Sequence, residues 1–524
     1  MILINSSPKD ALKIFQPFLP IFIPVGVGCL AAAADRAGVK AEIVDEQVEH
    51  DALGKIEEYL KSMEKPYIFA FSVLTAALKN AVALSTEIKR RYPDSIIIFG
   101  GIHPTALPDD VMKMPHIDAV IRGEGETPLI EYYEAIKNNG DIGAIKGLTY
   151  RKDGAIVHNP VSDIIEDLDY YPPFPYHRFS TKDYDLGFVI SSRGCPYKCI
   201  FCSNRVTTGK RYRHRSSEAI AEELKMLNEK YGRSYILFLD DNFLVNKKRV
   251  YELIDEIKKR GLHEKMTFNF QARGDNVNPE LLKDLHAAGF RSVFFGLETA
   301  SEEVMKTIKK GETVKQCVDA VKMAKRAGFH VSATFIYALP GEIHQDRMDA
   351  VMLSNELDLD MVRFNNATPY PGTELHEIAT AENNLNIKGT YENFNSVSTF
   401  IENPFNKIPF TYIPKGNTEK EIRMDILCSY LVFYLDFKRL KSIFASPDKG
   451  VGWFNAGDKI LQFFKKIPAL ALLGGVLSVK FSELFIYMLK KDSKLSFGEI
   501  AGLFKKRREF RKQAFIEQAQ NSRP

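Results

Sequence analysis

The sequence predicts an α/β protein that has two strand-and-helix domains and a C-terminal helical region. Short β-branched runs alternate with helical stretches in residues 1–140 and again in residues 188–370, whereas the pattern after residue 412 is helical. Alternation of this kind is typical of a parallel sheet covered by helices. We therefore expect a first domain at 1–140, a linker with a β-hairpin at 141–187, a second domain at 188–400 and a basic helical region at 401–524.

The pattern of the first domain predicts a doubly wound, Rossmann-like sheet. Its expected strands are residues 2–5, 41–44, 67–71, 95–99 and 119–121. The expected helices between them are residues 25–37, 52–63, 76–91 and 128–137. Ligands of such sheets bind outside the carboxyl ends of the strands. The segments that directly follow the strands are therefore the candidates for a binding site.

Glycine-rich segments follow two of these strands. Gly100-Gly101-Ile102-His103 comes after the fourth strand, and Gly123-Glu124-Gly125 comes after the fifth. Glycine allows the backbone to approach a bulky ligand closely and to adopt positive φ. The candidate ligand-binding residues of this domain are Ser72, Thr75, Gly100, Gly101, His103, Thr105, Gly123 and Glu124.

The linker and the second domain follow in order. Residues 147–151 and 155–158, around Asp153-Gly154, predict the hairpin of the linker. The expected strands of the second domain are residues 188–192, 235–240, 267–273, 292–297, 330–337 and 361–367. The connecting helices are expected at residues 217–230, 247–259, 279–288, 314–327 and 345–356. Six parallel strands of this kind predict a partial (β/α)6 barrel of the TIM type, whose chemistry takes place at the carboxyl ends of the strands.

Three cysteines follow the first strand of the barrel at positions i, i+4 and i+7. They are Cys195, Cys199 and Cys202, and Arg193-Gly194 precedes them. Thiolates suit iron–sulfur clusters, zinc and copper(I). A [4Fe–4S] cluster usually takes four cysteines, so three would leave one iron open to a small molecule. A zinc site with His214 as the fourth ligand, or simple buried thiols, are the alternatives.

The motif Cys-x3-Cys-x2-Cys after a first strand resembles the radical S-adenosylmethionine (SAM) superfamily. The resemblance implies that Cys195, Cys199 and Cys202 are the metal ligands and catalytic residues, and that SAM occupies the fourth iron of a [4Fe–4S] cluster. One electron from the cluster would then cleave SAM to methionine and a 5′-deoxyadenosyl radical.

The first domain resembles the cobalamin-binding domain that precedes the barrel in many radical SAM enzymes. The matching segments are residues 26–38 with 41–45, 72–75, 100–105 and 122–127. The resemblance implies that cobalamin (B12) binds among these loops. The Asp-x-His-x-x-Gly motif, whose histidine ligates cobalt in cobalamin mutases, is absent. We therefore expect His103 to be a loop contact near the nucleotide of cobalamin and not a cobalt ligand.

Polar residues at the strand ends of the barrel are the candidates for SAM binding. By resemblance, Asp240 and Asp241 lie near the SAM amino group or the substrate, and Arg273 meets the SAM carboxylate. By the same resemblance, Glu298 accepts hydrogen bonds from the ribose, and the backbone at Pro340-Gly341 contacts the adenine. The alternative for Arg273 and Glu298 is an ion pair inside the barrel.

Composition limits the compartment and the class of partner. Six cysteines in 524 residues are too few for a disulfide framework. Because a thiolate cluster needs a reducing compartment, we expect a cytoplasmic protein. The longest uncharged apolar stretch, residues 467–479, has 13 residues and is shorter than a membrane span. No nucleic-acid partner is expected.

The C-terminal region is basic and apolar. Residues 401–524 contain 22 Lys and Arg against 12 Asp and Glu. Apolar helices are expected within residues 412–437 and at 460–464, 470–479 and 481–489. Such helices could lie on the inner face of a membrane, pack on the rim of the barrel or form a dimer. The first of these would make the protein peripheral to the membrane.

These features together favour an enzyme that makes the 5′-deoxyadenosyl radical and methylates an unactivated carbon with the help of cobalamin. The alternative is radical-mediated cyclisation or C–C coupling of a tetrapyrrole or lipid without methyl transfer. A second alternative is a corrinoid-binding protein without catalysis. The expected partners are a small-molecule or lipid substrate and a reductant such as flavodoxin or ferredoxin.

Overall fold

The first sheet contains seven strands in the order β2-β1-β3-β4-β5-β6-β7. The computed structural model describes residues 1–8, 21–171, 173–396, 398–436, 439 and 460–521. The parallel strands are β1 (Ile2–Asn5), β2 (Glu42–Asp45), β3 (Ile68–Ser72), β4 (Ile96–Gly100) and β5 (Ala119–Ile121). Each lies within one residue of its predicted bounds, because each contains a short run of apolar residues.

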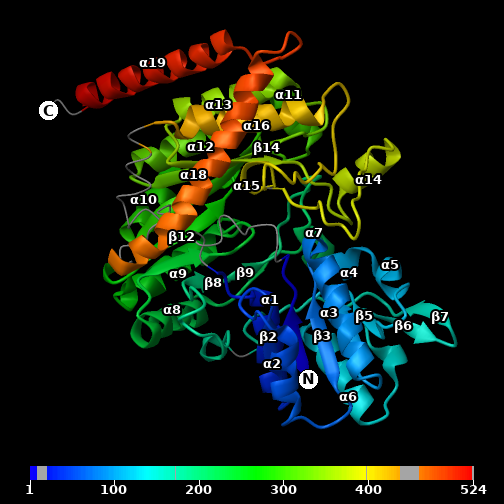
Figure 1. The fold of residues 1–524 in the computed structure, drawn as a ribbon. Coiled ribbons are helices and arrows are strands. Elements are labelled where there is room, and N and C mark those ends of the chain that lie inside the picture. Colours follow the sequence, from blue (N-terminus) through cyan, green and yellow to red (C-terminus); the bar gives the residue numbers. More distant parts are fainter. Residues whose placement is uncertain (9–20, 172, 397, 437–438, 440–459, 522–524) are drawn as a thin grey trace.

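Helices cover both faces of this sheet (Figure 1). The helices are α1 (Val25–Arg36), α2 (Ala52–Leu60), α3 (Leu78–Arg91), α4 (Ile102–Ala106), α5 (Pro108–Met112) and α6 (Glu126–Lys137). Strand β1 shows how the two faces are filled, since successive side chains point in opposite directions. Ile2 and Ile4 pack in the cluster that contains residues of α2 and α3, whereas Leu3 packs with residues of α1 and α6. The predicted doubly wound arrangement is confirmed.

The predicted hairpin belongs to this sheet. Strands β6 (Leu148–Lys152) and β7 (Ala155–His158) pair with each other, and β6 pairs antiparallel with β5. Leu148 and Tyr150 are buried against the core of the first domain. The sheet therefore continues past residue 140, into the segment that was expected to be a linker.

The second sheet has six parallel strands in the order β15-β14-β13-β12-β11-β8. They are β8 (Phe188–Val189), β11 (Tyr235–Phe238), β12 (Thr267–Ala272), β13 (Phe290–Glu298), β14 (His330–Tyr337) and β15 (Met361–Asn366). The covering helices are α8 (Ser217–Tyr231), α9 (Lys247–Lys259), α10 (Pro279–Ala287), α11 (Glu302–Thr307), α12 (Val314–Arg326) and α13 (His344–Glu356). Fully buried rings of Phe238, Phe268, Phe270 and Phe290 pack together in its core. This is the predicted partial barrel.

The first barrel strand is shorter than predicted. The chain bends after β8, and β9 (Ser192–Arg193) pairs antiparallel with β10 (Arg213–His214). The cause is Asp240, whose carboxylate accepts hydrogen bonds from the backbone amides of Ser191 and Ser192 at 2.7 and 3.0 Å. These bonds replace the backbone hydrogen bonds that a longer β8 would make with its neighbouring strand.

After the barrel, the described part of the chain contains helices, and those beyond residue 401 lie in the region that was predicted to be helical. They are α14 (Glu374–Ala381), α15 (Ser398–Ile401), α16 (Glu419–Tyr434), α18 (Ile460–Met488) and α19 (Phe497–Asn521). The three short helices expected between residues 460 and 489 form the single helix α18, which lies across the barrel in Figure 1. Within it, residues Ile467–Met488 are long and apolar enough to cross a membrane, by length and composition only. The sequence prediction considered only uncharged stretches and did not identify this segment, which contains Lys480 and Glu483.

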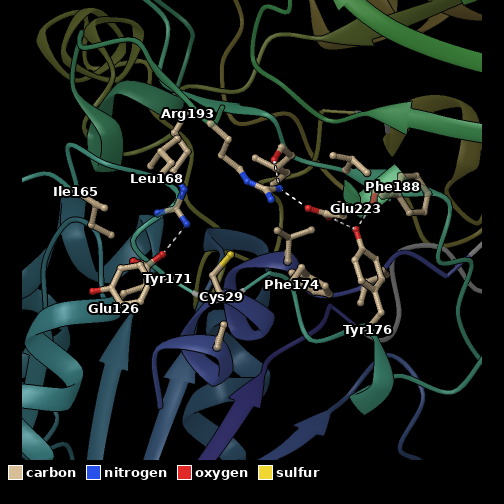
Figure 2. A pocket seen from close by; sticks show the side chains of 16 residues that line it. Cys29, Glu126, Ile165, Leu168, Tyr171, Phe174, Tyr176, Phe188, Arg193 and Glu223 are labelled. Carbon is tan, nitrogen blue, oxygen red and sulfur yellow. Dashed lines mark hydrogen bonds and ion pairs between the residues drawn. The ribbon is translucent and has the colours of Figure 1, made fainter. Parts of the chain in front are cut away.

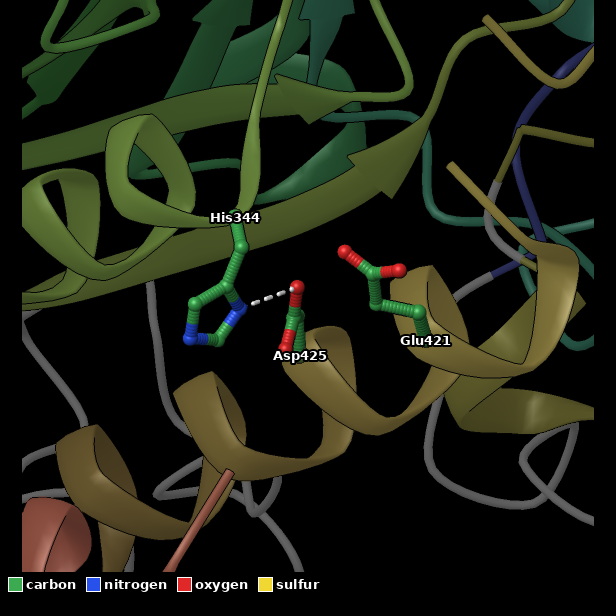
Figure 3. Close-up of side chains that lie close together, drawn as sticks. All are labelled: His344, Glu421 and Asp425. Atoms are coloured by element: carbon green, nitrogen blue, oxygen red, sulfur yellow. Dashed lines mark hydrogen bonds and ion pairs between the residues drawn. The ribbon is translucent and has the colours of Figure 1, made fainter. Parts of the chain in front are cut away.

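An ion-pair cluster fastens α13, α16 and α19 to one another, and Figure 3 shows its residues His344, Glu421 and Asp425. The His344 ring bridges Asp425 of α16 at 2.9 Å and Glu499 of α19 at 3.2 Å. Ligand atoms of His344, Asp425 and Glu421 lie within 4.8 Å of one another, as a metal site would require. However, the guanidinium of Arg347 already donates to both carboxylates, at 2.6 and 3.1 Å. The cluster is therefore neutralised by protein cations and serves to hold the helices together.

Candidate functional site

A cavity of about 410 Å³ lies between the two domains, where the carboxyl ends of both sheets face each other. The first domain lines it with residues that follow β3, β4 and β5, and the barrel lines it with residues around the cysteine segment and after β11. The lining includes Ser72, Gly100, Gly101, Gly123, Glu124, Ser192, Arg193, Gly194, Asn204, Thr207, Thr208 and Asp241. Strand ends that are far apart in the sequence therefore border one space.

The three cysteines lie together on the segment that follows β9. Each thiol is partly buried. Burial raises the pKa of all three, that of Cys202 to about 12, and the negative charges of Cys195 and Cys199 add to the effect at Cys202. Hydrogen bonds of Ile200 to the backbone of Ile308 and Leu375, at 3.1 and 2.9 Å, hold the segment in place. Such a site favours neutral thiols unless a cation such as a metal cluster accompanies the thiolates.

The geometry does not support the zinc alternative. The ligands of one zinc ion lie within about 4 Å of one another. Among the described residues, the cysteines do not form a set of three ligand atoms within 4.8 Å. His214, the proposed fourth ligand, contacts Asn246 at 3.4 Å and the carbonyl oxygen of Arg215 at 3.1 Å. Wider separation suits thiolates that bind different irons of one cluster.

The two aspartates after β11 have different surroundings. Asp240 is fully buried and accepts hydrogen bonds from Ser191 and Ser192. Asp241 lines the cavity and accepts hydrogen bonds from the Gly194 amide at 3.2 Å and from Asn204 at 2.5 Å. Burial and the neighbouring Asp240 raise the pKa of Asp241 to about 6. Asp240 therefore shapes the entry to the cysteine segment, and Asp241 faces the space where a ligand would bind.

Arg273 lies directly beside the cysteine segment. Its guanidinium stacks on the Tyr197 ring at 3.5 Å from the ring centre, and Nη1 is 4.0 Å from Sγ of Cys199. Two hydrogen bonds of 3.0 Å join it to the Asp275 carboxylate. The ion pair considered as the alternative for Arg273 is thus present, and it positions the guanidinium against a cysteine.

Glu298 ends β13 in an unusual backbone conformation, with φ at +61°. Its Oε1 binds the buried ammonium of Lys310 at 2.8 Å, and the same ammonium lies 3.4 Å from Glu312. Oε2 of Glu298 is buried and has no hydrogen-bond partner among the described residues. A free acceptor oxygen at a strand end suits a ribose hydroxyl. Backbone strain of this kind is found mainly at functional sites.

Pro340 and Gly341 follow β14 in a tight turn. Gly341 is exposed and has φ of +79°, and an added Cβ there would meet nothing within 4 Å. The turn is held by Glu342, whose carboxylate accepts a hydrogen bond from the Ala338 amide at 2.6 Å. The turn therefore has open space on its outer side, as an adenine contact would need.

In the glycine segments of the first domain, some residues line the cavity and others support them. Gly100, Gly101 and Gly123 line the cavity. Gly101 has φ of +98°, and an added Cβ would lie 3.0 Å from the backbone of Val73. Thr105 joins the segments from behind, since its hydroxyl donates to Gly101 at 2.7 Å and accepts from the Gly123 amide at 3.1 Å.

His103 and Thr75 are among the supporting residues and do not line the cavity. The His103 ring is buried, lies 3.4 Å from the Thr75 hydroxyl and packs edge-on against Tyr391. Burial lowers the pKa of His103 to about 4. His103 is thus a support for the loop. No histidine is among the described residues that line the cavity.

Glu124 joins the domains. Its carboxylate lies 2.7 and 2.9 Å from the Arg213 guanidinium and 3.3 Å from Arg193. Burial opposes ionisation, but the two arginines hold the pKa of Glu124 below its ordinary value. Arg193 also pairs with Glu126 at 2.7 Å. Figure 2 shows this second pair beside Cys29, at a smaller cavity of about 70 Å³ next to the first one.

Sequence reasoning did not single out several residues that line the main cavity. Asn204, Thr207 and Thr208 belong to α7 (Asn204–Thr208), which begins two residues after Cys202. Arg193 was noted only as the residue before Gly194. Their position in the sequence could have identified them, because polar residues next to the cysteines must lie at the same end of the barrel.

The residues present fit the expected groups. Three cysteines on one segment suit a [4Fe–4S] cluster with an open iron. The unpartnered oxygen of Glu298 and the cavity-facing Asp241 suit SAM. Glycines at the ends of β4 and β5 leave room for a large planar ligand. With no histidine in the described lining, cobalamin would bind without an imidazole of that lining on cobalt.

Comparisons with known proteins agree with this geometry. Residues 189–353 match the family model "Radical SAM superfamily", and residues 15–132 match "B12 binding domain". An uncharacterized methyltransferase of Pyrococcus horikoshii is 33% identical over 80% of this chain and 90% of its own length. The anaerobic magnesium-protoporphyrin IX monomethyl ester cyclase of Cereibacter sphaeroides is 26% identical over 82% of this chain and 69% of its own.

A solved structure shows the same fold over nearly the whole chain. The cobalamin-dependent S-adenosylmethionine radical enzyme OxsB, with aqua-cobalamin and S-adenosylmethionine bound, superposes with a TM-score of 0.64. The match covers 99% of this chain and 80% of that one at 16% identity. The chain is therefore an enzyme of the radical SAM superfamily that carries a B12-binding domain, and its expected cofactors are a [4Fe–4S] cluster, SAM and cobalamin.

Proposed function

We propose that this enzyme methylates an unactivated carbon of its substrate in a cobalamin-dependent radical reaction. The observation that carries the proposal is the cavity of about 410 Å³ between the domains. The glycine segments of the B12-binding domain and the start of the cysteine segment line the same space. A reaction that needs SAM, cobalamin and substrate in one place requires such a shared space.

The proposal gives each part of the site a task. When bound, the cluster supplies the electron that cleaves SAM, and cobalamin carries the methyl group. Cys195, Cys199 and Cys202 would hold the cluster. Asp241 would accept a hydrogen bond from the SAM amino group, and the free oxygen of Glu298 would accept one from the ribose.

The apolar side chains in the cavity wall also support the proposal. Ile98, Ile102, Leu129 and Ile190 give part of the lining an apolar character. Apolar walls exclude water, and this protects a reactive radical from side reactions. The glycine segments at Gly101 and Gly123 would bring the backbone close to the corrin.

One experiment tests the radical chemistry. Protein reconstituted with iron and sulfide without oxygen, then given SAM and dithionite, is expected to form 5′-deoxyadenosine. Cys199→Ala should lose this product at least 100-fold, whereas Cys428→Ala, a buried cysteine on α16, should retain it. Full product from Cys199→Ala would overturn the assignment of the cluster.

A second experiment separates methylation from the alternative. The cyclase among the relatives favours ring closure as the competing reaction. An extract of cells that lack the protein serves as the source of substrate, and SAM with a deuterated methyl group serves as the label. Methylation places the deuterated methyl in the product and releases S-adenosylhomocysteine. A product that needs 5′-deoxyadenosine formation but carries no label would favour cyclisation.

The electron must come from a partner. We propose a flavodoxin or a ferredoxin as the reductant, because these proteins deliver single electrons at low potential. A cytoplasmic location follows from the same chemistry, since three partly buried thiols must stay reduced to bind iron.

A further inference from the structure

Helix α18 differs from an ordinary surface helix because both its packed side and its exposed side are largely apolar. The side that packs on the protein contains Leu473, Val476, Lys480, Leu484 and Tyr487, all less than 9% exposed. Their spacing of three or four residues defines one helical face. A surface helix normally presents charges on the opposite face.

The opposite face of α18 is apolar. Large hydrophobic side chains are exposed there: Ile467 by 43%, Leu472 by 55%, Phe485 by 52%, Ile486 by 58% and Leu489 by 66%. The other exposed residues on this stretch are Pro468, Ala471, Gly474, Gly475, Ser478 and Ser482. We call this surface the α18 face. It extends over roughly 33 Å at 1.5 Å per residue.

The two charges of this stretch do not belong to the α18 face. The Lys480 ammonium is buried and donates to the carbonyl oxygen of Thr399 at 2.6 Å. Glu483 pairs with Lys407 at 2.8 Å. Between Ile467 and Leu489, the exposed residues of the described helix are therefore all uncharged, and the partly exposed Glu483 is paired with Lys407.

Cations border this surface. Lys490 and Lys491 follow it and are exposed. Helix α19 continues with exposed Lys505, Lys506, Arg508 and Lys512. The ring of Phe497, at the start of α19, contacts Phe485 with the ring centres 5.1 Å apart, so α19 begins at the edge of the α18 face. An apolar strip next to basic residues is the pattern of a helix that lies in the plane of a membrane surface.

We propose that the α18 face docks on an anionic lipid bilayer, with α18 parallel to the membrane and the cations of the following turn and α19 against lipid headgroups. A transmembrane orientation does not fit, because Lys480 and Leu484 hold one side of α18 against the protein. A second copy of this chain could cover the apolar strip, but the neighbouring cations favour an anionic partner.

The docked orientation has a consequence for the substrate, which rests on the proposed function. Phe400 of α15 packs against Leu473 of α18. A few residues earlier, the carbonyl oxygen of Ser396 accepts a hydrogen bond from the Asn366 amide, at the end of β15, at 2.9 Å. The packed side of α18 thus contacts Phe400, and Ser396 contacts the carboxyl end of β15 close by in the sequence, which suits an amphiphilic substrate that resides in the bilayer.

The test is flotation of the full-length protein with vesicles. We expect binding to vesicles of phosphatidylcholine with 30% phosphatidylglycerol to be at least tenfold stronger than to phosphatidylcholine alone. Leu472→Glu with Ile486→Glu should reduce this binding at least tenfold. The matched control, Val161→Glu with Tyr251→Glu, changes two other exposed hydrophobic residues and should bind as the wild type does. Thermal unfolding checks that both variants are folded.

Each other outcome overturns the proposal. Wild-type protein that stays unbound, or equal binding by the α18-face variant, would show that lipid does not cover this surface. A wild-type dimer in light scattering that becomes a monomer in the variant, without vesicle binding, would assign the surface to a second copy. Because flotation needs neither SAM nor reductant, its failure leaves the methylation proposal untouched.

Discussion

Glu124 and Arg213 meet across the domain boundary, with two carboxylate oxygens at 2.9 and 2.7 Å from two guanidinium nitrogens. Both side chains are about 95% buried. Glu124 follows β5 of the B12-binding domain, and Arg213 begins β10, which pairs with the strand before the cysteines. The pair therefore fixes the distance between the two ligand-binding halves of the cavity.

Removal of one partner should destabilise the enzyme strongly. Glu124→Gln leaves the buried Arg213 without its charge partner, and breaking a buried pair in this way costs about 3 kcal/mol or more. Urea unfolding should show this loss. As the control, Glu57→Gln removes a carboxylate that pairs with Arg91 at the surface and should cost less than about 1 kcal/mol. Similar losses in both variants would mean that the interdomain pair is unimportant.

Arg273 should affect the chemistry more than the assembly of the cluster. Arg273→Lys keeps the charge but loses the stack on Tyr197 and the double hydrogen bond to Asp275. We expect the iron content to stay near that of the wild type and 5′-deoxyadenosine formation to fall at least tenfold. Arg90→Lys, at an exposed position, is the control. A variant that loses its iron instead would indicate that Arg273 only supports the fold of the cysteine segment.

Much of the fold could be predicted because its signals are local. Strand β14 is a continuous run of strand-forming residues between two helices, and its bounds were predicted without error. Asp241 and Glu298 were predicted as ligand-binding residues because polar residues that end parallel strands gather at one edge. Contacts between residues of different domains could not be predicted in the same way. Glu124 and Arg213 are 89 residues apart, and only the packed domains bring them together.

Helix α18 shows a different limit. The search for an uncharged stretch ended at Lys480, so the sequence suggested short helices. In the structure, the carbonyl oxygen of Thr399 satisfies the buried ammonium of Lys480, and the helix continues. A buried charge needs a partner, and the partner of Lys480 belongs to a segment distant in the sequence.

Gly101 should be required for cobalamin binding and not only for stability. Gly101→Ala places a Cβ 3.0 Å from the Val73 backbone at a φ of +98°, so the segment that lines the cavity must shift. We expect at least a fivefold loss of cobalamin retained after gel filtration, measured by absorbance. Gly154→Ala also has positive φ but meets nothing within 4 Å. It should be destabilised by about 1–2 kcal/mol and retain cobalamin. Equal retention by both variants would contradict the proposed B12 site.

The link between His344 and the C-terminal helices should make stability depend on pH. Burial opposes protonation of His344, but its hydrogen bonds to Asp425 and Glu499 outweigh this, and its pKa is raised above the ordinary value of 6.5. Because the folded state binds the proton more tightly, the stabilisation is complete below about pH 6.5. It is lost as the pH rises through the raised pKa.

Thermal unfolding of the wild type and of His344→Gln across pH 5.5 to 9 checks this prediction. Burial raises the pKa of the neighbouring Glu342 to about 8, which gives a pH dependence of the same sign. The difference between the two proteins isolates the contribution of His344, because Glu342 is present in both. We expect the wild type to be the more stable at low pH and the difference to shrink toward pH 9. A difference that stays constant would show that His344 does not exchange a proton in this range.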